Sequence, residues 1–134
     1  MSSVAQGIDI VAVDRLREVC RRHSAFLAAV FTAREREYCL AQADPFAHLA
    51  GRFAAKEACL KALGLGLLGP MSGHALAGIE VERRPGGPPG LALSGWVGSL
   101  ARRRGVSRSA VSISYAAGLA LAAVVLVTGT PEKG

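Results

Sequence analysis

Aromatic residues are scarce in this chain. Phe, Trp and Tyr make up 5% of its 134 residues, whereas hydrophobic residues together reach 51%. The core must therefore consist mainly of alanine, leucine and valine, and the length suits one domain but not two. A disordered protein would have fewer aliphatic residues and a larger charge imbalance. We expect a single globular domain that spans residues 1–134.

Cysteines are few, and their number and spacing indicate neither a disulfide framework nor a metal site. Cys20, Cys39 and Cys59 are odd in number, lie in helix-like patterns and lack the spacing of metal ligands. We interpret them as reduced, buried residues of an intracellular protein rather than as thiol catalysts, because no histidine is positioned to activate one. Residues 1–13 lack the basic start of a signal peptide and contain Asp9. A cytoplasmic protein is therefore expected.

Acidic residues are outnumbered by basic ones, 10 against 16, which gives a net charge of +6. This balance favours an acidic partner, which can be a nucleic acid, an anionic membrane, a phosphate compound or an acidic protein. A nucleic-acid-binding protein would be expected to show interleaved aromatic residues, a zinc motif or a recognition helix, and the sequence shows none of these. We therefore expect no nucleic-acid partner.

Charge is absent altogether from residues 109–130, and four arginines precede this segment (Arg102, Arg103, Arg104 and Arg108). A basic flank followed by an apolar segment is typical of a membrane anchor. However, residues 112–115 alternate as a strand does, residues 116–118 can turn, and residues 119–127 indicate a second strand. We favour a buried hairpin and expect no membrane insertion. The arginines either solubilise this region, which we favour, or approach a ligand phosphate.

The remaining elements follow from periodicity and from capping signals. The pattern predicts a strand over residues 7–13, then a helix from Asp14 as N-cap to about Val30 and a second helix from the Thr32-x-x-Glu35 capping box to Ala43. After a break at Asp44-Pro45, a third helix runs from His48 to Leu63 and ends at Gly64 or Gly66. A glycine-rich loop to Gly78 follows, then strands at 79–83 and 91–93 and a helix at 96–104. Early helices and late antiparallel strands indicate the α+β class, with the N-terminal strand and the helices packed on an antiparallel sheet.

Two carboxylates occupy elements that otherwise appear buried. Glu57 shares one helix face with a largely apolar set (Leu49, Ala50, Phe53, Ala54, Leu60). Asp9 lies within the β-branched run of residues 7–13. Since a buried unpaired carboxylate is costly, both acids require a nearby cation. Together they suggest one site for a hard metal ion with oxygen ligands.

Lys61 follows Glu57 by four residues, so the two side chains are neighbours on the helix. One interpretation is a solvated ion pair that contributes about 0.2–0.5 kcal/mol. The apolar character of this face favours another, in which a metal held by Asp9 and Glu57 acts beside the Lys61 ammonium to bind a diphosphate. Mg²⁺ is usually held in this way, by one or two carboxylates together with waters and phosphates.

Four motifs occur in a fixed order: Gly7-Ile8-Asp9-Ile10, then Phe31-Thr32-x-x-Glu35 with Cys39, then Gly51-Arg52-Phe53-Ala54-Ala55-Lys56-Glu57-Ala58 followed by Lys61-Ala62-Leu63-Gly64, and finally Val111-Ser112-Ile113-Ser114. The chain thereby resembles the holo-acyl-carrier-protein synthases, the small bacterial 4′-phosphopantetheinyl transferases. The resemblance covers a core of about residues 6–128 and implies the fold of that family. It also implies transfer of 4′-phosphopantetheine from coenzyme A to a serine of an apo acyl carrier protein, with release of adenosine 3′,5′-bisphosphate.

The resemblance assigns roles to particular residues. It implies that Asp9 and Glu57 bind Mg²⁺ and that Asp9, Glu57 and Lys61 form the catalytic set. It leaves open whether Glu57 or a water on the metal takes the serine proton. The coenzyme A contacts that it implies are Arg52, Lys56, Lys61, Gly64, Ser114 and Tyr115.

The first helix carries a group of arginines opposite its apolar stripe (Arg15, Arg17, Arg21, Arg22). Such a group can be no more than a solvated face. The resemblance implies instead that Arg15, Arg21 and Arg22 dock the acidic recognition helix of the carrier protein. It further implies a homotrimer with active sites between subunits.

Tyr115 departs from the family pattern, in which a histidine follows Ser-Ile-Ser. Tyrosine donates a hydrogen bond but carries no positive charge near neutral pH. Three outcomes follow: a serviceable donor with weaker coenzyme A affinity, a specialised carrier-protein partner, or a degenerate enzyme that binds without transferring. We favour the first, because Asp9, Glu57 and Lys61 are retained.

Overall fold

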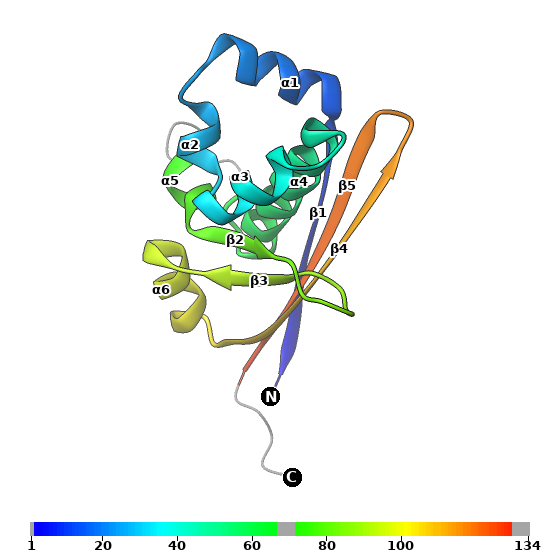
Figure 1. Ribbon diagram of the computed structural model, residues 1–134. Helices are drawn as coiled ribbons and strands as arrows, with labels where there is room; N and C mark the ends of the chain where they lie inside the picture. Colours follow the sequence, from blue (N-terminus) through cyan, green and yellow to red (C-terminus); the bar gives the residue numbers. More distant parts are fainter. Residues whose placement is uncertain (1, 67–71, 130–134) are drawn as a thin grey trace.

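The structure is a computed structural model that describes residues 2–66 and 72–129. Its elements, in chain order, are β1 (Ser3–Ala12), α1 (Val13–Arg22), α2 (Phe26–Val30), α3 (Ala33–Leu40), α4 (Pro45–Ala62), α5 (Ser72–Ala77), β2 (Ile79–Glu82), β3 (Gly90–Leu93), α6 (Gly95–Arg103), β4 (Val106–Ala116) and β5 (Leu119–Thr128). Figure 1 shows the helices gathered on one side of a long, narrow sheet. The expected α+β class is confirmed.

The main sheet is antiparallel with the strand order β1-β5-β4, and β2 pairs with β3 in a separate two-stranded sheet. The C-terminal hairpin is confirmed, but β4 begins at Val106, well before the predicted start at residue 112. Exposed polar side chains in its first half hid this strand from the pattern. No helix within residues 2–66 and 72–129 combines the length and the hydropathy that a membrane span requires.

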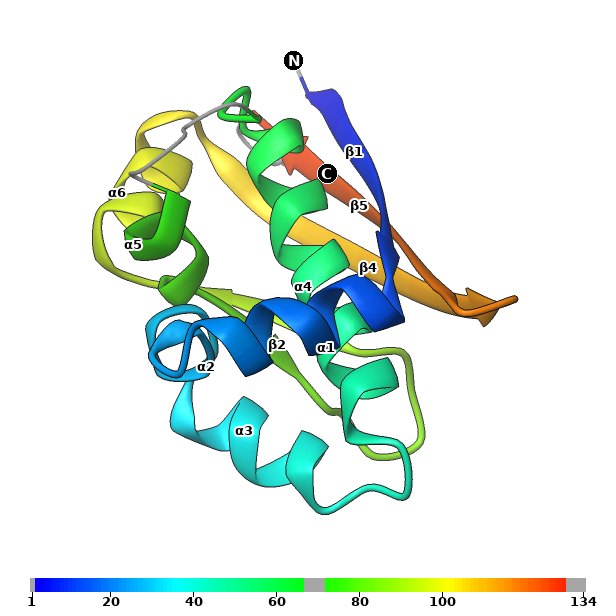
Figure 2. The same ribbon diagram turned by 90° about the horizontal axis from the view of Figure 1, so that it is seen from above.

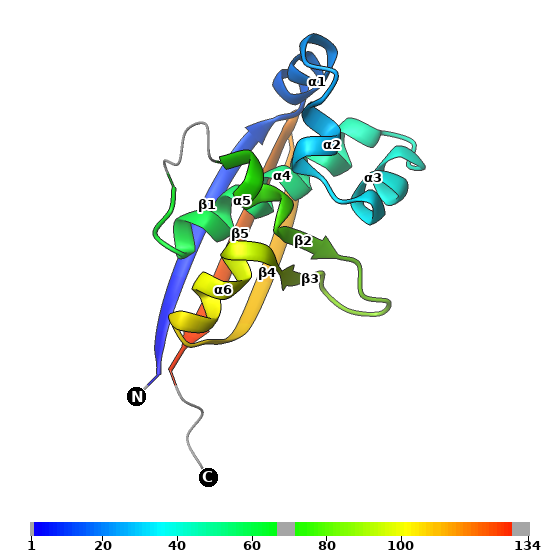
Figure 3. The same ribbon diagram turned by 90° about the vertical axis from the view of Figure 1, so that its left-hand side faces the viewer.

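Helix α4 lies along the inner face of this sheet (Figures 2 and 3). Gly7 makes the close approach possible, because a Cβ at this position would overlap the carbonyl oxygen of Ala58. Small residues line the facing surfaces: Ala54, Ala58, Ala120 and Ala122 are fully buried. This tight packing brings the inward side chains of β1 against the second half of α4.

The first predicted helix is wrong in two respects. Its residues form two helices, α1 and α2, because the chain becomes extended at His23. Asp14 is not the N-cap, since β1 runs directly into α1 and Ala12 occupies the cap without a side-chain hydrogen bond. The backbone N–H of Val13 donates instead to the carbonyl of Gly118, which fastens the start of α1 to the hairpin turn.

The predicted capping box is confirmed, but the predicted bounds of its helix and of the next one are not. The capping box of Thr32 and Glu35 is present, although α3 ends at Leu40 rather than at Ala43. Asp44 caps the N-terminus of α4, and Pro45 is the first residue of that helix, so α4 begins three residues before the predicted His48. The helix ends at Ala62, and Gly64, two residues later with a φ of 78°, completes a Schellman turn in which Leu65 N–H donates to the Leu60 carbonyl.

The expected glycine-rich loop before Gly78 is partly helical, because α5 occupies residues 72–77. The rest of that loop, residues 67–71, lies outside the described residues. The predicted strands at 79–83 and 91–93 correspond to β2 and β3, and the predicted helix at 96–104 corresponds to α6.

Candidate active site

Asp9 and Lys61 meet where β1 crosses the last turns of α4. Lys61 Nζ lies 2.9 Å from Asp9 Oδ1 and 3.0 Å from the carbonyl oxygen of Ile8. The Asp9 side chain is mostly buried, whereas the Lys61 side chain keeps 43% of its surface exposed. An ammonium held in this way retains contact with solvent, so it remains accessible to an anion.

Glu57 completes this group. Burial raises the pKa of its carboxyl group, the negative charge of Asp9 raises the pKa further, and Lys61 acts in the opposite direction. Two carboxylates that repel each other in a partly buried place are characteristic of a functional site. The structure thus brings together the three residues that the sequence singled out as a catalytic set.

Asp9 and Glu57 both line a cleft of about 590 Å³. We call it the carboxylate cleft; its other lining residues are Ile10, Val11, Ala12, Arg15, Leu16, Val19, Phe26, Phe53 and Leu119. The two acids therefore face a mostly apolar, open space. The partial burial of both acids strengthens their electrostatic interactions with a bound ligand.

These residues fit a magnesium site. Within the described ranges, no group of three or more His, Cys, Asp or Glu side chains is placed to enclose a metal ion. Mg²⁺ does not need such an enclosure, because it keeps several waters and uses one or two carboxylates together with substrate phosphates. Two carboxylates in an open cleft, with an ammonium beside them, match that requirement.

Lys56 does not join this site. It is fully buried, and its Nζ lies 2.7 Å from Glu35 Oε1 and 2.9 Å from the Leu76 carbonyl oxygen, with a third bond to the Ile79 carbonyl. All three N–H groups are thus engaged inside the protein. The expected coenzyme A contact of Lys56 disagrees with this placement, because no ligand phosphate can reach the ammonium.

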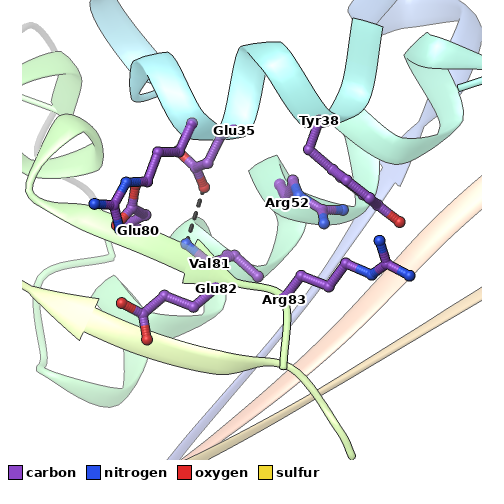
Figure 4. Close-up of a pocket in the computed structure, with 8 residues that line it drawn as sticks. Glu35, Tyr38, Arg52, Glu80, Val81, Glu82 and Arg83 are labelled. Atoms are coloured by element: carbon purple, nitrogen blue, oxygen red, sulfur yellow. Dashed lines mark hydrogen bonds between the residues drawn. The ribbon is translucent and has the colours of Figure 1, made fainter. Parts of the chain in front are cut away.

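Arg52 lies in a different cavity, of about 400 Å³ (Figure 4). We call it the arginine cavity; it is lined by Arg34, Glu35, Tyr38, Arg52, Glu80, Val81, Glu82 and Arg83. The Arg52 guanidinium carbon lies 4.6 Å from the centre of the Tyr38 ring, and that of Arg83 lies 5.1 Å from it. Only 7% of Arg52 is exposed.

The Arg52 guanidinium has no carboxylate within ion-pair distance in the part of the chain that the structure describes, and its Nε lacks a hydrogen-bond partner. A buried charge without a counter-charge is unfavourable. Three carboxylates line the arginine cavity beside its three arginines, so the cavity as a whole carries no excess of positive charge. Tyr38 and Arg83 were missed by sequence reasoning, because each lies in an ordinary polar stretch with no motif around it.

Tyr115 borders a cavity of about 410 Å³ that shares Tyr38, Arg52 and Arg83 with the arginine cavity. Its hydroxyl packs against α4 at Gly51, where a Cβ would overlap the hydroxyl oxygen. Burial raises the pKa of Tyr115, so the phenol stays protonated and uncharged at neutral pH. The position is therefore a hydrogen-bond donor beside a cationic cavity.

Two other predicted coenzyme A contacts lie apart from Tyr115. Ser114 is exposed, and as the preceding strand residue it points to the opposite face of the sheet. Gly64 is exposed at the C-terminal end of α4, close to Lys61, and the Arg104 guanidinium approaches it.

The two groups of site residues lie on different sides of α4. Arg52 and Lys61 are nine residues apart, and at about 100° per residue their side chains project in opposite directions. A single chain therefore keeps the arginine cavity away from the carboxylate cleft.

The arginines of α1 that the resemblance assigns to docking have different partners. Arg15 borders the carboxylate cleft. Arg21 and Arg22 both form ion pairs with Glu18.

The cysteines show no sign of catalytic activation. Burial raises the pKa of the Cys39 thiol to about 11 and that of Cys59 to about 12. Thiols with such high pKa values hold almost no thiolate at neutral pH and react slowly.

Comparison with known proteins identifies the family. Residues 5–122 match the family model of the 4′-phosphopantetheinyl transferase superfamily. The holo-[acyl-carrier-protein] synthase of Moorella thermoacetica is 44% identical over 128 residues, which cover 96% of this chain and 97% of that protein. The holo-[acyl-carrier-protein] synthase of Chloroflexus aurantiacus is 43% identical, and the match covers 92% of this chain and 97% of that protein.

Solved structures show the same fold. The synthase of Neisseria meningitidis has a TM-score of 0.79 at 30% identity and covers 91% of this chain and 96% of its own. The synthase of Helicobacter pylori, in complex with coenzyme A, has a TM-score of 0.73 at 31% identity, and the match covers 90% of this chain and 98% of that protein. The chain belongs to the holo-[acyl-carrier-protein] synthase family, within the 4′-phosphopantetheinyl transferase superfamily.

Proposed function

We propose that this protein transfers 4′-phosphopantetheine from coenzyme A to a serine hydroxyl of an apo acyl carrier protein. The observation that carries the proposal is the group formed by Asp9, Glu57 and Lys61: the two acids line the open carboxylate cleft, and the Lys61 ammonium is bonded to Asp9. In the reaction, a bond forms between the serine oxygen and the β-phosphorus as the bond to the leaving phosphate breaks. The serine loses its proton, and adenosine 3′,5′-bisphosphate is released.

Asp9 and Glu57 would hold Mg²⁺, which when bound neutralises charge on the diphosphate of coenzyme A. Lys61 contributes a second positive charge, held in place by Asp9 and the Ile8 carbonyl. Phosphoryl transfer depends mainly on alignment and charge neutralisation, and a fixed ammonium serves both. We propose that either Glu57 or a water on the metal accepts the serine proton, because both would lie in the carboxylate cleft.

We also propose that the active form is a homotrimer. The cavity that Tyr115 borders is lined by Arg52, Arg83 and Arg84, so it and the carboxylate cleft both suit phosphate groups, yet one chain holds Arg52 and Lys61 on opposite sides of α4. A symmetric assembly can place Arg52 and Tyr115 of one subunit beside Asp9, Glu57 and Lys61 of the next. Coenzyme A would then bind across the subunit boundary.

The carrier protein is proposed to dock on α1 through Arg15, Arg21 and Arg22. Arg15 supports this placement, because it borders the cleft that contains Asp9 and Glu57. An acidic helix bound there would bring its serine toward the two carboxylates. A cytoplasmic location is in keeping with the free state of Cys20, Cys39 and Cys59.

A second candidate is a homologue that binds coenzyme A and carrier protein but transfers slowly. The feature that favours it is Tyr115, an uncharged donor in the place of the family histidine. One assay separates the two: the protein is incubated with apo carrier protein, coenzyme A and Mg²⁺, and the carrier mass is followed by mass spectrometry, with EDTA as control.

The transferase is supported if transfer requires Mg²⁺ and is abolished in Asp9→Ala and Glu57→Ala. Circular dichroism must show that both variants are folded. Binding of both substrates without transfer supports the second candidate. Near-normal activity in either variant would remove the metal assignment.

A further inference from the structure

A single carboxylate on α1 occupies two arginines that are proposed to dock the carrier protein. Glu18 Oε2 accepts a hydrogen bond from Arg21 Nε at 2.9 Å, and Glu18 Oε1 accepts one from Arg21 Nη2 at 2.5 Å. The same Oε1 accepts a third bond from Arg22 Nε at 2.8 Å. These charge-assisted bonds lower the pKa of Glu18, Arg21 contributing most and Arg22 next, so the carboxylate is ionised at neutral pH.

All three side chains are solvent-accessible, with 43% of Glu18 and about two thirds of each arginine exposed. Arg15, on the same helix, has no carboxylate within ion-pair distance among the residues that the structure describes. The docking face of α1 therefore contains one arginine that is open to a partner and two that share an internal carboxylate.

We infer that Glu18 is an intramolecular competitor that sets how acidic a carrier protein must be in order to bind. The inference rests on the proposed function. A partner with one carboxylate near Arg21 and Arg22 only exchanges places with Glu18, so no ion pair is gained. A partner with two carboxylates gives each arginine its own counter-charge and leaves Glu18 hydrated. Glu18 thus selects for docking helices that present at least two acids here.

The expected size of the effect follows from the exposure of these groups. Solvent-exposed ion pairs contribute little individually, and each corresponds to a change in affinity of at most about fivefold. Releasing two arginines from Glu18 should therefore tighten carrier binding by about two- to tenfold. The chemistry at Asp9 and Glu57 is not touched, so the effect should appear in KM for the carrier and not in kcat.

The test compares the wild-type protein with Glu18→Gln. The substrates are an apo acyl carrier protein with an acidic docking helix and the same carrier with one acid of that helix changed to its amide. We expect Glu18→Gln to lower KM for both carriers without changing kcat, and to lower it more for the carrier that lacks one acid. The preference for the more acidic carrier therefore shrinks in the variant.

Glu37→Gln is the matched control, because Glu37 is exposed on α3 and its replacement changes the net charge equally. An equal decrease of KM in both variants would mean that only net charge matters and would overturn the inference. A Glu18→Gln effect that persists in an Arg21→Gln/Arg22→Gln background would overturn it too. Failure of this inference can be distinguished from failure of the proposed function, because only absence of transfer by the wild-type protein would refute the proposed function.

Discussion

Lys56 Nζ lies 2.7 Å from Glu35 Oε1, and neither side chain exposes any surface to solvent. The two Glu35 oxygens also accept the backbone N–H groups of Thr32 and Val81, and Figure 4 shows the bond to Val81. The pair therefore joins α3, α4 and β2. Burial lowers the pKa of Lys56, and the Glu35 carboxylate opposes this effect. Lys56 immediately precedes Glu57, so the pair also fixes the rotation of α4 that turns Glu57 toward the carboxylate cleft.

Lys56→Met should lower the free energy of unfolding by about 3–5 kcal/mol, because it leaves the Glu35 carboxylate buried without a counter-charge. Urea denaturation measures the loss. Lys61→Met is the matched control: its ion pair with Asp9 is partly exposed, so the cost should be about 1 kcal/mol or less. Activity should show the reverse order, with folded Lys61→Met almost inactive. Equal urea midpoints for the two variants would show that the buried pair is not a major source of stability.

The contrast between these two lysines also shows how far sequence reasoning reaches. The Thr32–Glu35 capping box was readable because its signal is local. The partners of Lys56, by contrast, lie 20 or more residues away in the chain, and no periodic pattern identifies them. Helix α4 is buried around most of its circumference, so an apolar stripe could not tell which of its charged residues faces the interior.

Asp9 and Glu57 were predictable for a different reason. Each carboxylate interrupts an apolar element, and such an interruption persists only with a compensating cation or a function. Tyr38 and Arg83 interrupt nothing, so only the fold brings them together around the arginine cavity. The break between α1 and α2 was equally hidden, because residues 23–25 contain neither glycine nor proline.

Tyr115→His should lower KM for coenzyme A, because a histidine at this position can carry a positive charge beside Arg52. The gain should increase as the pH falls through about 6.5, the ordinary histidine pKa, since the imidazole becomes charged below it. Steady-state kinetics at several pH values between about 6 and 8 measure the change. Identical KM values for the two proteins at every pH would mean that residue 115 does not contact the coenzyme A phosphates.

Glu57→Gln should stabilise the metal-free protein at neutral pH. Burial and the Asp9 charge raise the pKa of Glu57 in the folded state, so ionised Glu57 opposes folding there. Between the ordinary glutamate pKa of about 4.3 and the raised value, this penalty disappears as the pH falls, and the variant then loses its advantage.

Thermal unfolding in EDTA across this pH range measures the difference. Addition of Mg²⁺ should stabilise the wild-type protein more than the variant, because Glu57 is a proposed ligand. A variant that is less stable than the wild type at neutral pH in EDTA would contradict the electrostatic account of the site.

The face of the sheet that carries no helices exposes large apolar side chains. On β1, Ile8 is 57% exposed and Ile10 is 61% exposed, while the inward residues Gly7 and Asp9 lie against α4. Figures 1–3 show the helices packed on the other face. An apolar surface of this kind is typical of a protein–protein interface. We expect it to form the subunit contact of the proposed homotrimer.

Ile8→Glu should therefore dissociate the assembly, because the contact would bury a charge from each subunit. Sedimentation equilibrium measures the oligomeric state. If active sites form between subunits, specific activity should fall on dissociation and recover as the protein concentration rises, since association restores the missing half of each site. Leu40→Glu is the control, because Leu40 is also exposed but lies on α3, away from the sheet. A dissociated Ile8→Glu variant with full activity at every concentration would show that one chain suffices for catalysis.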